Sequence, residues 1–146
     1  MNCKDQMWHP VGTRAPRVDG EDKVTGRARF GADLMFDNML WGQPVRTPYP
    51  HARIARIDKS KAEAVPGVVR VLTAEDVPGS RTFGVVVQHQ PVLCWDRVRF
   101  MGDAVALVLA ESREAAQAAA RAVQVEYEEL PSVFDPEEAI RPEAPQ

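Results

Sequence analysis

Ala104-Val-Ala-Leu-Val-Leu-Ala110 is a continuous apolar run, and Ser112, a residue type that commonly caps helices, follows it closely. A run of this kind predicts a central strand covered on both faces. Polar residues at 113, 114, 117 and 121 face away from alanines at 115, 118, 119 and 122, which predicts a helix over Arg113–Ala122 packed closely on a sheet. Val123–Tyr127 alternates apolar and polar residues, as a half-exposed strand does. We therefore expect a strand–helix–strand unit whose helix makes a right-handed crossover between parallel strands.

The segments on either side of this unit favour short strands and brief helices. Apolar or alternating runs predict strands over residues 39–49, 52–58 and 68–72, and residues 84–87, 91–93 and 98–100 are further short apolar pieces. Prolines 44 and 48 indicate an irregular or edge position for the first of them, and the second has the pattern of a bulged strand. Ser60-Lys-Ala-Glu63 has capping-box spacing and predicts a short helix that Pro66-Gly67 ends. Thr73–Asp76 predicts one further helical turn.

These elements predict an α+β fold, a mixed β-sheet with two or three packed helices. Residues 1–29 are polar with scattered glycine and proline and predict an extended N-terminal arm, residues 30–135 predict the folded domain, and residues 136–146 predict an exposed C-terminal segment. Between Glu126 and Glu143 seven acidic residues stand against one base, Arg141, which favours a solvated exit segment.

Composition excludes several classes of protein. The chain has 146 residues, a net charge of −3 and 45% hydrophobic residues, values typical of one globular domain and without the basic surplus of a nucleic-acid binder. No apolar run approaches the roughly 20 residues of a membrane helix, and Met1–Pro10 lacks the core of a signal peptide. Two cysteines, Cys3 and Cys94, make no disulfide framework, so we expect a soluble protein of the reducing cytoplasm.

Residues that could carry chemistry are few. They are the histidines His9, His51 and His89, the cysteine Cys94, two acidic groups (Asp19, Glu21 and Asp22; Glu126, Glu128 and Glu129) and a triad assembled on paper from Ser112, His89 and Asp96. The histidines have no metal-ligand spacing, the acidic groups are explained by solvated faces, and no nucleophile elbow supports the triad. No glycine-rich phosphate loop occurs. We assign no catalytic, cofactor-binding or metal-binding residue, and residue patterns alone predict no function.

An ordered set of short blocks does carry a resemblance. The blocks are Asp22-Lys-Val-Thr-Gly-Arg-Ala28, Ala32-Asp-Leu34, Met39-Leu-Trp-Gly42, Val45-Arg-Thr-Pro-Tyr-Pro-His-Ala-Arg-Ile54, Ile57-Asp58, Pro66-Gly-Val-Val69, Thr73-Ala-Glu-Asp-Val-Pro-Gly79, Pro91-Val-Leu93, Val98-Arg-Phe-Met-Gly-Asp-Ala-Val-Ala106 and Val125-Glu-Tyr-Glu-Glu-Leu-Pro131. In this order and spacing they resemble the a/b hammerhead domain of the large subunit of molybdenum hydroxylases, such as xanthine dehydrogenase and aldehyde oxidase. The resemblance covers roughly Val11 to Ala139.

The chain departs from the family pattern at several positions. Thr47 stands where serine is usual, Asp103 where glutamate or glutamine is usual, and Cys94 where alanine is common. Asp37-Asn38 replaces a Pro-Gly-like turn, a mild change because both residues tolerate turn geometry. These departures leave the substrate within the family open.

The resemblance implies that the parent enzyme hydroxylates a carbon centre of an N-heterocycle or an aldehyde with oxygen from water. It implies a molybdenum–pterin cofactor on later domains of the same subunit, with iron–sulfur clusters and FAD on partner domains or subunits. No cofactor and no catalytic residue is assigned to this chain, and neither nucleic acid nor membrane is expected as a partner.

Two roles follow for the chain itself. It is either a scaffolding segment of the molybdopterin-binding subunit or a stand-alone protein-binding module derived from that domain. The motif Thr47-Pro-Tyr-Pro-His-Ala-Arg53 fits a docking surface, although a rigid turn preorganised by two prolines explains it better. A scaffolding segment should expose a large apolar patch, so the isolated chain is expected to self-associate or to need a partner.

Overall fold

The computed structural model describes Gly12, Arg14 and residues 16–145. The chain divides into two units, one that ends at Asp37 and one that begins at Asn38. The first unit contains a short helix, α1 (Gly20–Val24), and a 3-10 turn, η1 (Gly31–Asp33). No residue of either element is buried. The helix lies inside the region expected to be an extended arm, and Cys3 and His9 lie outside the described residues.

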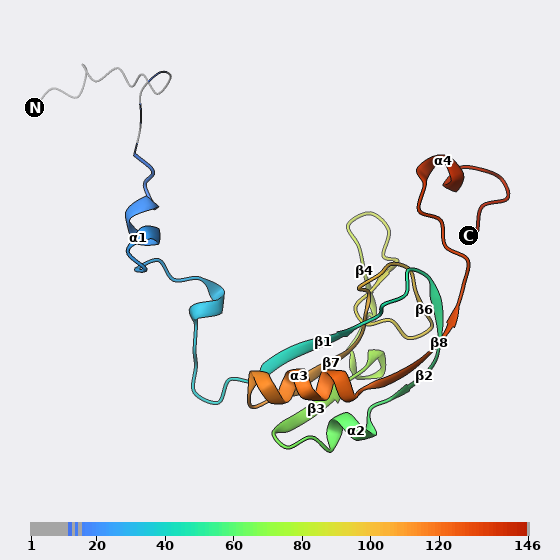
Figure 1. Ribbon diagram of the computed structural model, residues 1–146, viewed down its shortest axis with the longest axis horizontal. Helices are drawn as coiled ribbons and strands as arrows, with labels where there is room; N and C mark the ends of the chain where they lie inside the picture. Colours follow the sequence, from blue (N-terminus) through green and yellow to red (C-terminus); the bar gives the residue numbers. More distant parts are fainter. Residues whose placement is uncertain (1–11, 13, 15, 146) are drawn as a thin grey trace, which may run out of the picture. The chain divides into compact units, whose positions relative to one another are not determined.

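The second unit is built on an antiparallel sheet with the strand order β1-β7-β3 (Figure 1). Its strands are β1 (Trp41–Arg46), β7 (Ala104–Ala110) and β3 (Val68–Leu72). β7 has the predicted bounds and the predicted central position. Pro44 lies on β1, an edge strand with an irregularity after Val45, as the prolines indicated.

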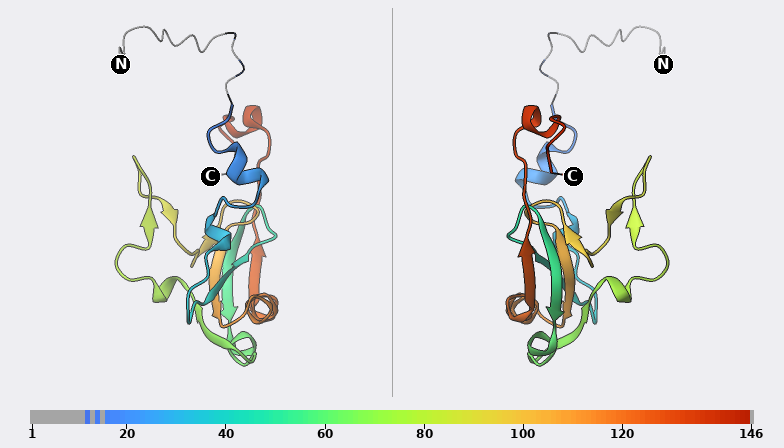
Figure 2. Two further views of the ribbon diagram at one scale, coloured as in Figure 1. Left: turned by 90° about the vertical axis from the view of Figure 1, so that its left-hand side faces the viewer. Right: turned by 90° about the vertical axis from the view of Figure 1, so that its right-hand side faces the viewer.

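A second antiparallel sheet has the order β6-β2-β8. It consists of β6 (Arg97–Val98), β2 (Ala52–Asp58) and β8 (Gln124–Glu129), and the register of β2 against β8 shifts between Ile54 and Arg56, which confirms the predicted bulge. A separate hairpin joins β4 (Thr82–Phe83) to β5 (Gln90–Pro91) and stands away from both sheets in Figure 2.

The α+β class is confirmed, but the expected parallel crossover is wrong. Every strand pair among the described residues is antiparallel, and β7 and β8 belong to different sheets. Helix α3 (Arg113–Ala122) therefore carries the chain from one sheet to the other and does not return it to the same sheet. The reason is that Val125 and Tyr127 of β8 pack against the core beneath β2, where β2 offers β8 an antiparallel partner.

The core consists of two clusters that share strand β7. Val105 packs with residues of β2 and β6 in the first cluster, while Ala106 and Val108 pack with the helices in the second. Successive side chains of a strand point to opposite faces, so β7 serves both clusters at once. This arrangement confirms that its apolar run is covered on both faces.

Helix α3 begins where the sequence predicted. The Ser112 Oγ atom accepts a hydrogen bond from the Ala115 amide at 3.1 Å, a cap that satisfies one of the free amides of the first turn. The predicted alanine face is partly wrong, because Ala116 and Ala119 are the buried residues and Ala118 is exposed. Because α3 is rich in alanine, the positions of its polar residues predict which face is buried only to within one residue.

Helix α2 (Ser60–Glu63) is short, as expected, but it lacks the predicted capping box. Asp58, at the end of β2, accepts hydrogen bonds from the amide of Ser60 at 3.0 Å and from its hydroxyl at 2.6 Å. The serine hydroxyl is thus already engaged outside the helix. A capping box does form at the next helical turn, the 3-10 turn η2 (Ala74–Asp76), between Thr73 and Asp76.

One further helix, α4 (Pro136–Ala139), lies in the segment expected to be exposed, and none of its residues is buried. Asp135 caps it through hydrogen bonds from the amides of Glu137 at 2.7 Å and Glu138 at 3.2 Å. An aspartate followed by proline is a recognised start signal, so the sequence did contain this helix. Among the described residues, no helix has the length and apolar character needed to cross a bilayer.

Candidate functional site

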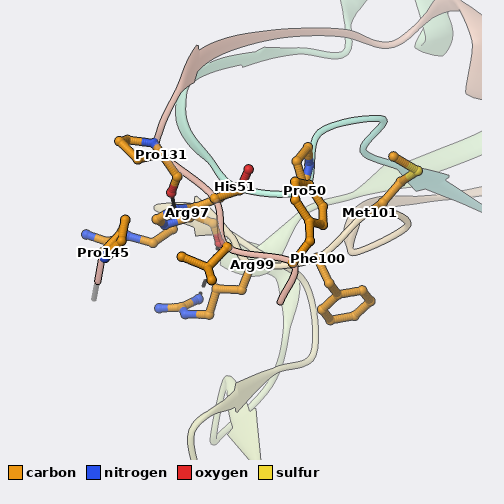
Figure 3. A pocket seen from close by; sticks show the side chains of 11 residues that line it. Pro50, His51, Arg97, Arg99, Phe100, Met101, Pro131 and Pro145 are labelled. Atoms are coloured by element: carbon orange, nitrogen blue, oxygen red, sulfur yellow. Dashed lines mark hydrogen bonds between the residues drawn. The ribbon is translucent and has the colours of Figure 1, made fainter. Parts of the chain in front are cut away.

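The predicted docking motif forms one wall of an open pocket of about 420 Å³ at the end of the second sheet (Figure 3). Pro50 and His51 come from the turn that precedes β2. Arg97, Arg99, Phe100 and Met101 come from β6 and the loop after it, and residues 131–134 come from the chain after β8. Pro145, near the C-terminus, also lines it, so four stretches of the chain meet at this pocket.

Backbone contacts hold the turn in place. Thr47 is buried, its amide donates to the Asp103 carbonyl at 3.0 Å, and its own carbonyl accepts from the Gly102 amide at 2.9 Å. The Thr47 hydroxyl accepts a hydrogen bond from the Tyr49 amide at 3.1 Å. The turn is thus built by hydrogen bonds as well as by its prolines, and its outer side chains are presented on a rigid frame.

His51 links the turn to the strand that ends beside it. Its Nδ1 atom lies 2.6 Å from the carbonyl oxygen of Pro131, and its own carbonyl accepts from the Leu130 amide at 3.0 Å (Figure 3). The short contact with a carbonyl requires a proton on Nδ1, which leaves Nε2 as the acceptor of the neutral ring. His51 is therefore a structural clamp, as its lack of a ligand set indicated.

The pocket combines positive charge with exposed apolar side chains. Arg97 and Arg99 line it, and no acidic residue among the described ones does. Within the part of the chain that the structure describes, neither arginine forms a salt bridge. Phe100, Met101 and Phe134 are exposed beside them. Such a surface suits a partner that carries carboxylates and apolar side chains together.

Beneath the turn, three of the departures from the family pattern come together. Thr47 bonds to the backbone of Asp103, and the Asp103 side chain neighbours Cys94, whose thiol is fully buried. The ring centroids of Tyr127 and Tyr49 lie 5.0 Å apart, and the Tyr49 amide bonds to the Thr47 hydroxyl. A change in side-chain volume or polarity at one of these positions is expected to alter the effect of a change at another. The reason is that contacting residues do not contribute independently to stability.

Burial in this cluster, with a contribution from the Asp103 carboxyl, raises the pKa of the Cys94 thiol from 9.0 to about 12. A thiol that stays protonated when folded and ionises near pH 9 when unfolded stabilises the fold below pH 9. That contribution is lost as the pH rises toward 12. The Cys94→Ala variant should therefore lose stability less steeply above pH 9, by up to about 1.4 kcal/mol per pH unit.

Urea unfolding between pH 7.5 and 11 measures this difference in slope. A Val69→Ala variant serves as the control and should keep the wild-type slope, because Val69 is exposed and does not titrate. Burial also raises the pKa of Tyr127, so both proteins are compared in a Tyr127→Phe background, which removes that contribution. Equal slopes for the wild-type and Cys94→Ala proteins, or rapid reaction of Cys94 with a disulfide reagent in the native state, would contradict the assignment.

The remaining candidates take structural or surface positions. Ser112 caps α3, His89 lies in the β4–β5 hairpin and Asp96 precedes β6, and no hydrogen bond among the described residues joins the three. Asp19, Glu21 and Asp22 pair with Arg17, Lys23 and Arg27, which confirms a solvated, ion-paired face. Glu126, Glu128 and Glu129 are exposed on β8. No group of three potential metal ligands occurs in the described part of the chain.

Of the residues that line the pocket, the motif Thr47–Arg53 had marked Pro50 and His51, but the residues of the other walls had not been singled out. Arg97 and Arg99 flank Val98, and the exposed Phe100 and Met101 follow directly, so basic and large apolar side chains are concentrated in five residues. That concentration was the available signal. Its meaning depends on the turn at Pro50 and the segment after β8, which only folding brings beside it.

Comparison with known proteins gives the family. The family model "Aldehyde oxidase and xanthine dehydrogenase, a/b hammerhead domain" matches residues 25–131. The chain is 51% identical over 128 residues to a probable xanthine dehydrogenase subunit of Bacillus subtilis, covering 88% of this chain and 17% of that protein. It is 41% identical over 138 residues to the nicotinate dehydrogenase large molybdopterin subunit of Eubacterium barkeri, covering 94% of this chain and 32% of that protein.

Comparison with solved structures leads to the same family. The aldehyde oxidoreductase from Desulfovibrio desulfuricans superposes with a TM-score of 0.85 at 36% identity, over 92% of this chain and 16% of that one. The chain thus spans a sixth to a third of the length of these relatives. On the match of its family model and on these identities, the chain belongs to the aldehyde oxidase and xanthine dehydrogenase a/b hammerhead domain family.

Proposed function

We propose that this domain is a docking and scaffolding segment of the molybdopterin-binding subunit of a xanthine dehydrogenase-like oxidoreductase. The observation that carries the proposal is the pocket beside the Thr47–Arg53 turn, where Phe100, Met101 and Phe134 expose 51, 67 and 80% of their surface next to two arginines. Apolar groups gathered in this way around charged ones are typical of a protein interface.

The chemistry of the parent enzyme is part of the proposal. We propose that it hydroxylates an N-heterocycle or an aldehyde, in line with relatives named for xanthine and nicotinate. The molybdenum–pterin group would supply the oxidation, with iron–sulfur clusters and FAD on partner domains or subunits accepting the electrons. The domain's own residues would fix the position of the cofactor-bearing domains.

The described residues do not fit the role of cofactor ligands. Among them, no buried side-chain nitrogen or oxygen lacks a hydrogen-bond partner, so no buried polar group in this part of the chain is left free for a ligand. The buried Cys94 thiol has a raised pKa, which opposes the thiolate form that a metal requires. The residues that hold the cofactor are therefore proposed to lie in other parts of the subunit.

Molybdenum and pterin content tests the proposal directly. The 146-residue chain is purified alone, and also after co-production with the proposed cofactor-bearing remainder of the large subunit as a separate polypeptide, named here the downstream polypeptide. We expect no stoichiometric metal on the chain alone, and molybdenum and pterin in a complex that the tagged chain retains. Stoichiometric molybdenum on the isolated chain would show a site in the domain itself.

A second readout separates docking from a stand-alone module. The Arg97→Glu/Arg99→Glu variant reverses the charge of the pocket and should weaken the complex, while an Arg113→Glu variant on α3, where the arginine is also exposed, should leave it intact. If the wild-type chain forms no complex with the downstream polypeptide, the scaffolding role is wrong and the stand-alone module gains support.

A further inference from the structure

We propose that the β4–β5 hairpin inserts its tip into an uncharged apolar cavity on the remainder of the large subunit. The tip, named here the valine tip, consists of Val85, Val86 and Val87. This inference rests on the proposed function and assigns one of its contacts to a surface separate from the pocket at the Thr47–Arg53 turn.

The valine tip is the most exposed apolar group of the second unit. Val85 and Val86 have relative exposures of 104% and 93%, and Val87 has 61%. Phe83 and Val92, at the base of the same hairpin, are about half exposed. Figure 2 shows this hairpin projecting beyond the two sheets. Three adjacent valines in water mark an interaction element, because single exposed apolar residues are common but such groups are not.

The hairpin is also free of charge. From Thr82 to Trp95 there is no aspartate, glutamate, lysine or arginine, in a chain in which 27% of residues are charged. Protein interfaces lose charged residues at the core that becomes fully buried, while the rim keeps them. Arg81 directly precedes the uncharged stretch and Asp96 directly follows it, which corresponds to a rim on either side.

The conformation of the tip is built in advance of binding. The Val87 carbonyl accepts from the His89 amide at 3.0 Å and lies 2.9 Å from His89 Nδ1. A Cβ atom at Gly84 would collide with that same carbonyl oxygen, so only glycine allows this close approach. At the base, the Val92 amide donates to the Arg81 carbonyl at 2.9 Å. A preorganised loop loses less conformational entropy when it binds.

The partner that binds the valine tip is inferred from the length of the relatives and from the charges on the candidate binding surfaces. The two relatives from Eubacterium barkeri and Bacillus subtilis are about three and five times longer than this chain, so most of their polypeptide lies outside the region matched here. A second copy of this domain is a poor partner, because its pockets near β2 and β6 are lined with arginine. A membrane is a poor partner too, because the stretch lacks the lysine and arginine that bind anionic headgroups.

The test compares three variants of the chain in complex with the downstream polypeptide. Val85→Ser/Val86→Ser removes the apolar tip, Val85→Ile/Val86→Ile keeps it, and Arg97→Glu/Arg99→Glu reports on the separate pocket. We expect the serine variant to bind about tenfold more weakly or worse, and the isoleucine variant to stay within about threefold of wild type. Thermal melting of each free variant checks that the fold is retained.

Hydrogen exchange gives a readout independent of affinity. The amides of residues 85–88 should exchange quickly in the free chain and become protected in the complex. If the wild-type complex forms while these amides stay unprotected and the serine variant binds normally, this inference is wrong and the scaffolding role stands. If no complex forms, both are wrong. Binding to phosphatidylcholine vesicles that the serine change abolishes, without protection in the protein complex, would assign the tip to lipid instead.

Discussion

Replacing Val108 with aspartate is expected to leave most of the isolated domain unfolded at room temperature. Val108 is fully buried in the central strand β7, where it opposes Val71 of β3 and packs with Ala106 and Ala119. A carboxylate there has no partner and must stay charged in an apolar core or take up a proton. We expect a cost of about 4 kcal/mol or more, comparable with the whole stability of a small domain.

Val69→Asp is the matched control, because it makes the same change in the neighbouring strand β3 at a residue that is 54% exposed. Its cost should stay within about 1 kcal/mol. Circular dichroism and urea unfolding of the two variants measure the contrast. If the Val108→Asp protein unfolds at the same urea concentration as the wild type, β7 does not lie between two packed layers.

Enlarging Ala119 to leucine is expected to cost about 2 kcal/mol in the free energy of unfolding. Ala119 lies on the face of α3 that packs on the sheet and is fully buried against Val71 and Val108. The larger side chain must push the helix away from the sheet, and overpacking of this kind costs on the order of 1 to 3 kcal/mol.

Ala118→Leu is the control, one residue away on the same helix but exposed, and it should change the stability by about 0.5 kcal/mol or less. Both variants are compared by thermal and urea unfolding. This pair also tests the corrected face of α3, because the sequence placed residues 118 and 119 together on the packed side. Equal losses at both positions would restore that interpretation.

The valines of the hairpin tip show where local reasoning fails. Val85–Val87 are β-branched and apolar, and such a run predicts a strand. The structure instead places the two short strands at Thr82–Phe83 and Gln90–Pro91 and leaves the valines in the loop between them. A β-branched residue favours a strand because a neighbouring strand covers it, and within the described residues no other strand pairs with this loop.

The pocket could not be predicted for a different reason. Its walls come from residues near 50, near 100 and near 132 and from Pro145, and the sequence carries no signal that these segments meet. They meet because β6 and β8 both pair with β2, so the loops at the same end of those strands converge. The family blocks do reach the segments near 50, near 100 and, at Pro131, near 132, but only as a resemblance and not as a surface.

The sequence by itself determined the local elements whose signals lie within a few residues. The unbroken apolar run of β7, the serine cap and period of α3, the bulge in β2 and the α+β class all follow from side-chain type and spacing. Tertiary structure alone decided the antiparallel direction of the strands, their division between two sheets, the buried face of α3 and the meeting of distant loops. These features depend on which surfaces bury each other, and that free energy belongs to pairs of residues far apart in the chain.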